Sequence, residues 1–218
     1  MTARPLSDRM LAEQAQAFDA MLVHPFVRDL AADRLPDAAF DRYLLIEGAF
    51  VDTAIAIFGY AVAKACDLDD RRKLIGSLDG LAHGQMDYFR DAYAGRGLAP
   101  DPGLQADPRV AAFRDGMLAI ARDGDFADIL TAMFAAEWMY WTWCDAHRCA
   151  RLADPIRQGW IDLHAAPEFQ AQARWLRDRV DRIGTTLPED RQTALIALFG
   201  HVQRLEVSFH DAAWSGAA

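Results

Sequence analysis

The stretch AAFDRYLLIEGAFVDTAIAIFGYAVAKA, residues 38–65, decides the fold class of this chain. Its apolar residues recur at helical spacing along the whole stretch and cover more than one face of the helix. The preceding Leu35-Pro36-Asp37 is a typical helix start, because proline at the first helical position already has the backbone angle that a helix needs. A helix with several apolar faces has to be surrounded by other helices. The stretch therefore predicts a helical bundle.

The rest of the chain has the same helical periodicity, and strand signals are nearly absent. The sequence APDPGLQADP, residues 99–108, is the one obvious loop, with three prolines in ten residues. We expect one all-α domain over residues 1–218, built from about eight or nine helices. The expected helices cover residues 7–23, 25–33, 36–66, 69–96, 108–122, 126–152, 155–165, 167–183 and 186–214.

Composition and charge limit the kinds of partner. Apolar residues make up 52% of the chain and charged residues 25%, which is typical of a globular protein. The net charge of −9 argues against binding to nucleic acid or to an anionic membrane, because both depend on basic patches. No run of about twenty apolar residues is present, so we expect no membrane span. The N-terminal MTARPLSDRMLAEQAQ lacks the apolar core of a signal peptide, and the chain has only three cysteines, which together predict a cytoplasmic protein.

Three glutamates, Glu47, Glu137 and Glu206, lie within apolar helical runs. Glu137 is the clearest case, because it lies among the aromatic residues of FAAEWMYWTW, residues 134–143. Each carboxylate either faces solvent or belongs to a polar pocket, because burying it unpaired is costly. Inward-facing carboxylates from different helices are how bundles build polar sites. Gly48, which follows Glu47, either lets another group approach the backbone closely or loosens the helix.

We expect no metal and no cofactor at such a site. A di-iron bundle needs about four carboxylates and two histidines, commonly as Glu-x-x-His, and the chain has no Glu-x-x-His. The pattern Cys144-x-x-His147-x-Cys149 is a weak metal pattern, because it lies on one expected helix without a partner cluster. Buried carboxylates beside aromatic rings instead suit a planar, nitrogen-rich heterocycle. The rings stack on it, and the carboxylates bind its amino group and transfer protons.

Four blocks of the sequence resemble the TenA/thiaminase II family, in the order that the family has them. The blocks are LVHPFVRDLAADRLPDAAFDRYLLIEGAFV (22–51), DFADILTAMFAAEWMYWTW (125–143), WIDLHAAPEF (160–169) and RLEVSFHDAAW (204–214). The resemblance implies the haem-oxygenase-like all-helical fold and a homo-oligomer, either a dimer or a tetramer. It also implies a metal-independent hydrolase of thiamine salvage, which converts aminomethyl or formylaminomethyl pyrimidine to hydroxymethyl pyrimidine.

The resemblance implies roles for individual residues. The acid that grips the pyrimidine ring falls on Glu47. The late glutamate, which donates a proton to the leaving group, falls on Glu206. The walls of the pocket are predicted to be Phe50, Trp138, Tyr140 and His164.

Four positions depart from the family pattern. Glu47 is a glutamate where the better-known branch has aspartate, and His164 stands where the family has a tyrosine. Ala136 stands where the family has its catalytic cysteine, and Phe50 stands where it has a tyrosine hydroxyl. The chain therefore looks similar to the branch of the family that lacks the cysteine and has a glutamate in this helix. Glu137 lies about 100° further around the helix than Ala136. It is interpreted as a base that activates water, as a support for other groups, or as a residue of the helix packing.

Two other functions stay open. A haem-oxygenase-like di-iron oxidase would share the architecture but would show further Glu and His ligands. A non-catalytic pyrimidine-binding or regulatory member of the family would keep the pocket without the chemistry, and Ala136 and Phe50 favour that alternative.

Overall fold

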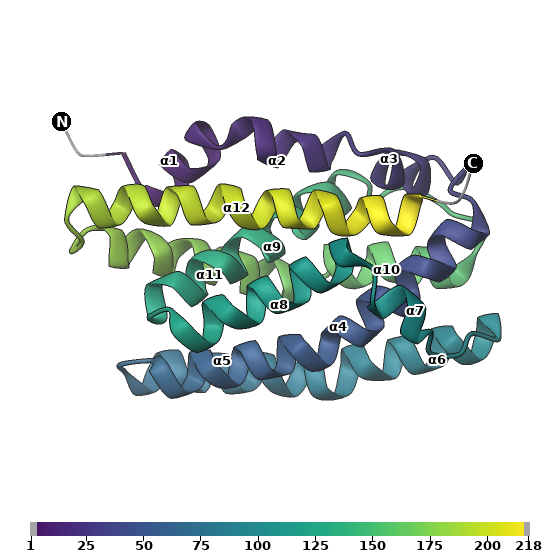
Figure 1. Cartoon of the computed structure of the whole chain (residues 1–218), viewed down its shortest axis with the longest axis horizontal. Helices are drawn as coiled ribbons and strands as arrows, with labels where there is room; N and C mark the ends of the chain where they lie inside the picture. Colours follow the sequence, from purple (N-terminus) through teal and green to yellow (C-terminus); the bar gives the residue numbers. More distant parts are fainter. Residues whose placement is uncertain (1–3, 216–218) are drawn as a thin grey trace. The chain divides into compact units, whose positions relative to one another are not determined.

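The computed structural model describes residues 4–215, and within them it contains helices and no strand. The prediction of an all-α fold is therefore confirmed. Figure 1 labels the α-helices, which are α1 (Leu6–Glu13), α2 (Ala15–Leu22), α3 (Pro25–Ala31), α4 (Asp37–Lys64), α5 (Leu68–Gly80), α6 (Met86–Arg96), α7 (Pro102–Gln105), α8 (Pro108–Asp123), α9 (Phe126–Ala146), α10 (Pro155–Ala165), α11 (Pro167–Gly184) and α12 (Glu189–Trp214). The π-helix η1 (Leu81–Gln85) lies between α5 and α6 in the chain.

Asp-Pro pairs set the starts of three helices, with Asp101 before α7, Asp107 before α8 and Asp154 before α10. In each pair the aspartate side chain accepts a hydrogen bond of 2.8 Å from the backbone N–H two residues later. The proline takes the first helical position, where no N–H is needed. The predicted starts of α8 and α10 are therefore confirmed. The expected loop over residues 99–108 was wrong in part, because Asp101 caps the short helix α7 inside it.

Two other expected helices differ from the structure. The helix expected over residues 7–23 divides at Gln14, where the backbone leaves the helical range (φ −110°, ψ 21°). The side chain of Gln14 lies against the backbone of α12, since a Cβ added to Gly200 would lie 1.9 Å from Oε1 of Gln14. Helix α9 ends at Ala146, earlier than expected, because a run of turns follows it.

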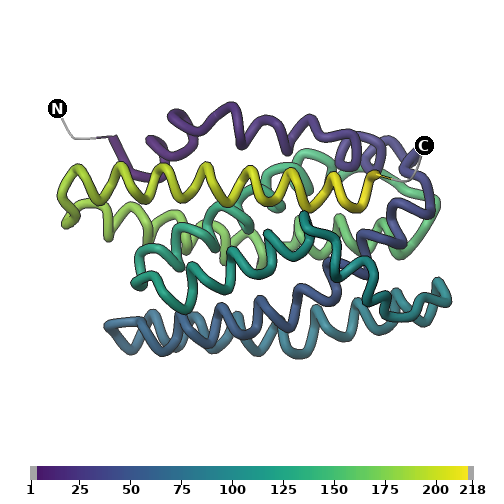
Figure 2. The backbone as a smooth tube through the Cα atoms, viewed as in Figure 1, coloured from purple at the N-terminus to yellow at the C-terminus, as the bar shows by residue number. Residues whose placement is uncertain are grey.

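The helix expected over residues 69–96 consists of three consecutive segments, α5, η1 and α6. Figure 2 shows the chain running through them along one continuous path. The residues at the two junctions keep right-handed helical backbone angles. A π-helix is wider than an α-helix, so η1 changes which side chains of α6 face its neighbours.

The contacts within the chain group into two compact units. Unit 1 consists of Met1–Arg34 and Leu130–Val207, and unit 2 consists of Leu35–Ile129 and Ser208–Ala218. The expectation of one domain over residues 1–218 stays a prediction, and each unit is described by itself.

In unit 1, polar and aromatic contacts join helices that are distant in sequence. The backbone N–H and the hydroxyl of Ser7 on α1 donate to the two carboxylate oxygens of Asp181 on α11, at 2.7 and 2.9 Å. The ring of Phe199 on α12 lies 6.4 Å from Phe18 on α2 and 5.5 Å from Phe134 on α9, between centroids. These contacts tie the N-terminal helices to the C-terminal part of the chain.

In unit 2, α4 packs against α5, α6 and α8. Lys64, at the end of α4, donates three hydrogen bonds to the backbone at the end of α8. The acceptors are the carbonyl oxygens of Ala121, Arg122 and Gly124, at 2.8, 2.8 and 2.6 Å from Nζ. The last carbonyls of a helix lack partners within it, and a cation there is favourable. Lys64 therefore caps α8.

Helix α4 is also the one helix of residues 4–215 that is long and apolar enough to cross a membrane, judged by length and composition alone. Its mean hydropathy reaches 1.6 over 18 residues, and 39% of that window is buried. Core helices of soluble proteins pass the same test, so a single such helix is weak evidence for a span. The expectation of no membrane span stays a prediction.

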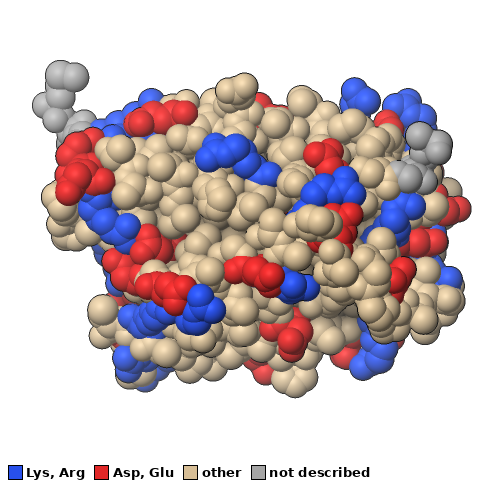
Figure 3. Space-filling view, in the orientation of Figure 1, with Lys and Arg blue, Asp and Glu red and all other residues tan. Residues whose placement is uncertain are grey.

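Charged side chains of both signs are interspersed on the face shown in Figure 3. Among the described residues, Arg122 is paired with Asp123 at 2.6 Å and Arg148 with Asp145 at 3.0 Å. Exposed pairs of this kind contribute little to stability, because solvent screens them.

Candidate functional site

A buried carboxylate and a phenol meet between α9 and α12. Glu206 on α12 is fully buried, and Tyr140 on α9 is 6% exposed. The Tyr140 hydroxyl donates to Oε2 of Glu206 across 3.4 Å, which is long for an O–H···O bond. Both residues were predicted to be site residues, and both lie in unit 1. The carboxylate that the sequence places in an apolar run thus has a polar neighbour inside the protein.

Gln203 holds the two helices in register at this point. It lies one turn before Glu206 on α12 and donates a buried hydrogen bond of 2.6 Å to the carbonyl oxygen of Ala135 on α9. Breaking that bond would leave the buried Gln203 amide without this acceptor, which is costly. Gln203 therefore links α9 and α12 close to Tyr140 and Glu206.

His164, on α10, continues the cluster. Its ring lies 5.4 Å from that of Tyr140 and stacks on Trp160 at 4.0 Å, between centroids. Nδ1 lies 2.9 Å from the carbonyl oxygen of Trp160, and because a carbonyl only accepts, Nδ1 carries the proton in this contact. Burial lowers the pKa of His164 to about 4, so the ring is neutral at neutral pH and Nε2 is an acceptor.

Trp160 belongs to this cluster but was not predicted. Its ring stacks on that of Trp143 at 5.0 Å with an interplanar angle of 16°, and it lies 5.6 Å from the ring of Tyr140. A signal was present in the sequence, since Trp160 and His164 are four residues apart in WIDLHAAPEF and so share a helix face.

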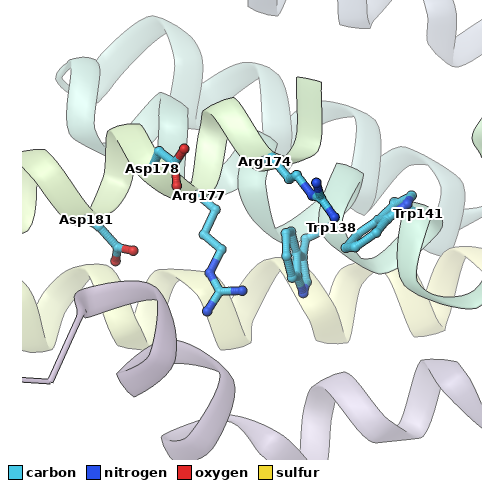
Figure 4. A pocket seen from close by; sticks show the side chains of 6 residues that line it. All are labelled: Trp138, Trp141, Arg174, Arg177, Asp178 and Asp181. Atoms are coloured by element: carbon cyan, nitrogen blue, oxygen red, sulfur yellow. The ribbon is translucent and has the colours of Figure 1, made fainter. Parts of the chain in front are cut away.

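The structure places Trp138 in a different environment. Its ring contacts among the described residues are with Phe134, Trp141 and the Arg177 guanidinium, which lies 4.8 Å above it. Figure 4 shows Trp138 and Trp141 of α9 beside side chains of α11. These side chains border an open hollow of about 520 Å³. The residues lining the hollow are Trp138, Trp141, Arg174, Arg177, Asp178 and Asp181.

Glu137 and Ala136 are both partly exposed, in contrast to their buried neighbours Ala135 and Met139. Glu137 lies three residues before Tyr140, so the two side chains lie on nearby faces of α9. The role of Glu137 as a base, as a support or in packing stays a prediction.

The remaining predicted site residues, Glu47 and Phe50, belong to unit 2. Glu47 is 6% exposed, which fits a buried carboxylate in an apolar run. Phe50 lies in an aromatic cluster, 4.6 Å from Phe113 and 6.3 Å from Phe209 between ring centroids. The meeting of Glu47 with Glu206 stays a prediction.

Within residues 4–215, no group of three or more His, Cys, Asp or Glu side chains is arranged to hold a metal ion. In the weak pattern noted above, Cys144 is buried whereas Cys149 is exposed, so the two thiols lie in different surroundings. Whether the protein carries a metal stays a prediction that elemental analysis tests.

Residues 11–216 match the TENA/THI-4/PQQC family. The aminopyrimidine aminohydrolase of Halalkalibacterium halodurans is 26% identical over 211 residues, 94% of each chain. The aminopyrimidine aminohydrolase of Bacillus subtilis is 20% identical over 219 residues, 97% of this chain and 93% of that protein. The solved TenA homologue from Pyrococcus furiosus has a TM-score of 0.88 at 20% identity and covers 96% of this chain and 100% of its own. Because the family match extends over nearly the whole sequence, the chain belongs to the TENA/THI-4/PQQC family.

Proposed function

We propose that this protein is an aminopyrimidine aminohydrolase of thiamine salvage, from the branch of the family without the catalytic cysteine. The observation that carries the proposal is the fully buried Glu206 with the Tyr140 hydroxyl beside it. Full-length relatives named aminopyrimidine aminohydrolase support the same activity. The substrate is a small aminopyrimidine, either the aminomethyl or the formylaminomethyl compound, and no metal or cofactor takes part.

In the proposed reaction water replaces the amine on the exocyclic methylene carbon of the pyrimidine. A new C–O bond forms, the C–N bond breaks, and the hydroxymethyl pyrimidine leaves together with ammonia from the aminomethyl compound or formamide from the formylaminomethyl compound. Glu206 donates the proton that the departing amine needs, and Glu137 accepts the proton that the attacking water loses. At the end of the reaction Glu206 has lost one proton and Glu137 has gained one. Proton exchange with solvent then returns both carboxyl groups to their starting states.

The other site residues bind and orient the ring. Glu47 accepts hydrogen bonds from the pyrimidine amino group, and Phe50, Tyr140 and His164 are the walls of the pocket, whereas Trp138 lines the hollow beside α11. The neutral His164 offers an acceptor at Nε2 without adding a charge. The protein acts in the cytoplasm as a homo-oligomer, either a dimer or a tetramer, and binds neither nucleic acid nor membrane.

The test is mass spectrometry of chelator-treated protein incubated separately with 4-amino-5-aminomethyl-2-methylpyrimidine, its N-formyl form and thiamine. We expect hydroxymethyl pyrimidine from at least one of them, with labelled oxygen when the solvent is H₂¹⁸O. Glu206→Gln should lower the rate by about 10²–10⁴-fold, the usual effect of removing a general acid. Glu168→Gln is the matched control, because Glu168 is exposed on α11 and should turn over normally.

Two results would overturn the proposal. One is the lack of any turnover of all three compounds by the wild-type protein. The other is full activity in Glu206→Gln.

A non-catalytic, pyrimidine-binding role is the second candidate, and Ala136 in place of the nucleophile favours it. It predicts that the pyrimidines raise the melting temperature without being converted. The di-iron alternative predicts about two iron atoms per chain in protein purified without chelator.

A further inference from the structure

Gly48, the residue after Glu47, admits an aromatic side chain from another helix. A Cβ added at Gly48 would lie 2.1 Å from the hydroxyl oxygen of Tyr93 and 2.9 Å from its Cζ. It would also lie 2.9 Å from Cδ1 of Phe89, which together with Tyr93 belongs to α6. Any side chain larger than hydrogen would therefore displace Tyr93. Of the two roles expected for Gly48 from the sequence, close approach of another group is the one that the structure has.

The Tyr93 hydroxyl is held by a hydrogen bond to the backbone of α4. It donates a hydrogen bond of 2.9 Å to the backbone carbonyl oxygen of Leu44 on α4. In an α-helix that carbonyl is also the acceptor for the N–H of residue 48, four residues later. Tyr93 therefore adds a second donor to the turn of α4 that carries Glu47.

The π-helix η1 comes directly before α6, and α4 packs against both. The π-helix separates α5 from α6, and its wider turn changes which residues of α6 face α4. Phe89 and Tyr93 lie four residues apart, so their rings lie side by side on one face of α6, 6.3 Å apart between centroids. Phe89 is buried, which holds the neighbouring ring of Tyr93 from one side.

We propose that Tyr93 is a positioning residue for Glu47. Its ring, lying over Gly48, and its bond to Leu44 hold the turn of α4 from which the Glu47 carboxylate projects. The inference rests on the proposed function, in which Glu47 grips the pyrimidine, and it adds a residue that the family resemblance does not assign.

The electrostatics of Tyr93 agree with this geometry. Burial is the main cause that raises the pKa of Tyr93 to about 12, and the negative charge of Glu47 raises it further. The phenol therefore keeps its proton near neutral pH and remains a donor to Leu44. Because the charge of Glu47 affects the pKa of Tyr93, replacing Glu47 should change the titration of Tyr93. Replacing Tyr93 should likewise change the surroundings of the Glu47 carboxylate.

The test follows the NMR signals of Tyr93 and Glu47, and it does not require the protein to convert a substrate. In protein labelled with [¹³Cζ]tyrosine, the Tyr93 signal is identified by its absence from Tyr93→Phe. We expect this signal to begin its alkaline shift at lower pH in Glu47→Gln than in the wild type, because the charge that opposes ionisation is gone. In protein labelled at the glutamate side-chain carboxyl, the Glu47 signal should move in Tyr93→Phe.

Tyr60→Phe is the matched control, since Tyr60 also lies on α4 but is thirteen residues from Glu47, about 20 Å along the helix. It should leave the Glu47 signal unchanged. A Glu47 signal that is identical in the wild type and in Tyr93→Phe would overturn the proposal, and so would a Tyr93 titration that ignores Glu47→Gln.

Steady-state kinetics test whether the positioning of Glu47 by Tyr93 affects catalysis. We expect Tyr93→Phe to lower kcat/KM for the preferred pyrimidine about tenfold, and Tyr60→Phe to leave it within twofold. If the wild type converts no pyrimidine but the two NMR signals respond to each other as expected, the proposed function fails and the Tyr93–Glu47 link stands. If turnover is found but the signals are independent, the link fails and the function stands.

Discussion

His164 offers a quantitative test of the buried cluster. Its pKa falls from 6.5 to about 4 in the folded protein, because burial disfavours the charged ring. In the unfolded chain the same ring takes up a proton near pH 6.5. As the pH falls from 6.5 toward 4, the unfolded state therefore binds more protons and becomes relatively more stable.

The size of the effect follows from the shift. Above pH 6.5 both states are neutral at this residue, so it adds no pH dependence. At pH 5 the folded state has lost about 2 kcal/mol relative to neutral pH, and the loss reaches about 3 kcal/mol near pH 4. That is a large fraction of the about 5–15 kcal/mol that usually stabilises a domain.

The assay is urea unfolding between pH 4.5 and 8 of the wild type, His164→Phe and His201→Phe. Phenylalanine keeps a ring at position 164 but cannot take up a proton. The stability difference between the wild type and His164→Phe should therefore change with pH by about 2 kcal/mol between pH 7 and 5. His201 is exposed, so its variant should follow the wild type. Parallel curves for His164→Phe and the wild type would refute a buried neutral ring.

Three further predictions concern other parts of the chain. Gly48→Ala should lower the free energy of unfolding by about 2 kcal/mol, because the new methyl group displaces the Tyr93 hydroxyl; an unchanged urea midpoint would contradict this. In the native protein iodoacetamide should modify the exposed Cys66 and Cys149. It should spare Cys144, because that thiol is buried and burial raises its pKa. Mass spectrometry of the intact chain counts the modified cysteines. Arg177→Met should lower the free energy of unfolding by about 1–2 kcal/mol, because it removes the ion pair to Asp8 at 2.5 Å and the contact with the Trp138 ring. The loss should be smaller in 1 M NaCl, which screens the ion pair in the wild type, and calorimetry with and without that salt measures it.

The sequence predicts the helices well where a local signal sets their ends. The Asp-Pro starts of α8 and α10 are local, since one side chain and one ring determine them. The break at Gln14 coincides with a contact to Gly200, which lies far along the chain and so could not be read from the local sequence. The π-helix η1 is equally hidden, because its residues LAHGQ have no property that marks a wider turn.

The same distinction holds for the candidate site. The resemblance implies roles for Glu206 and Tyr140, and the structure places the two side chains together, but their roles stay a prediction. Trp160 was missed although its helical spacing to His164 was visible. Tyr93 could not be predicted, because what brings it to Glu47 is the packing of α6 on α4, and neither sequence segment specifies that packing by itself.

The close fit of Tyr93 over Gly48 also has an evolutionary consequence. In homologues, a methyl or larger group at position 48 and a bulky ring at position 93 should exclude one another, so the two positions should change together along a lineage. Chains that have exchanged this glycine for alanine should carry a shorter residue on the facing helix. Sequences that freely combine alanine at 48 with tyrosine at 93 would show that the backbone can move apart to make room.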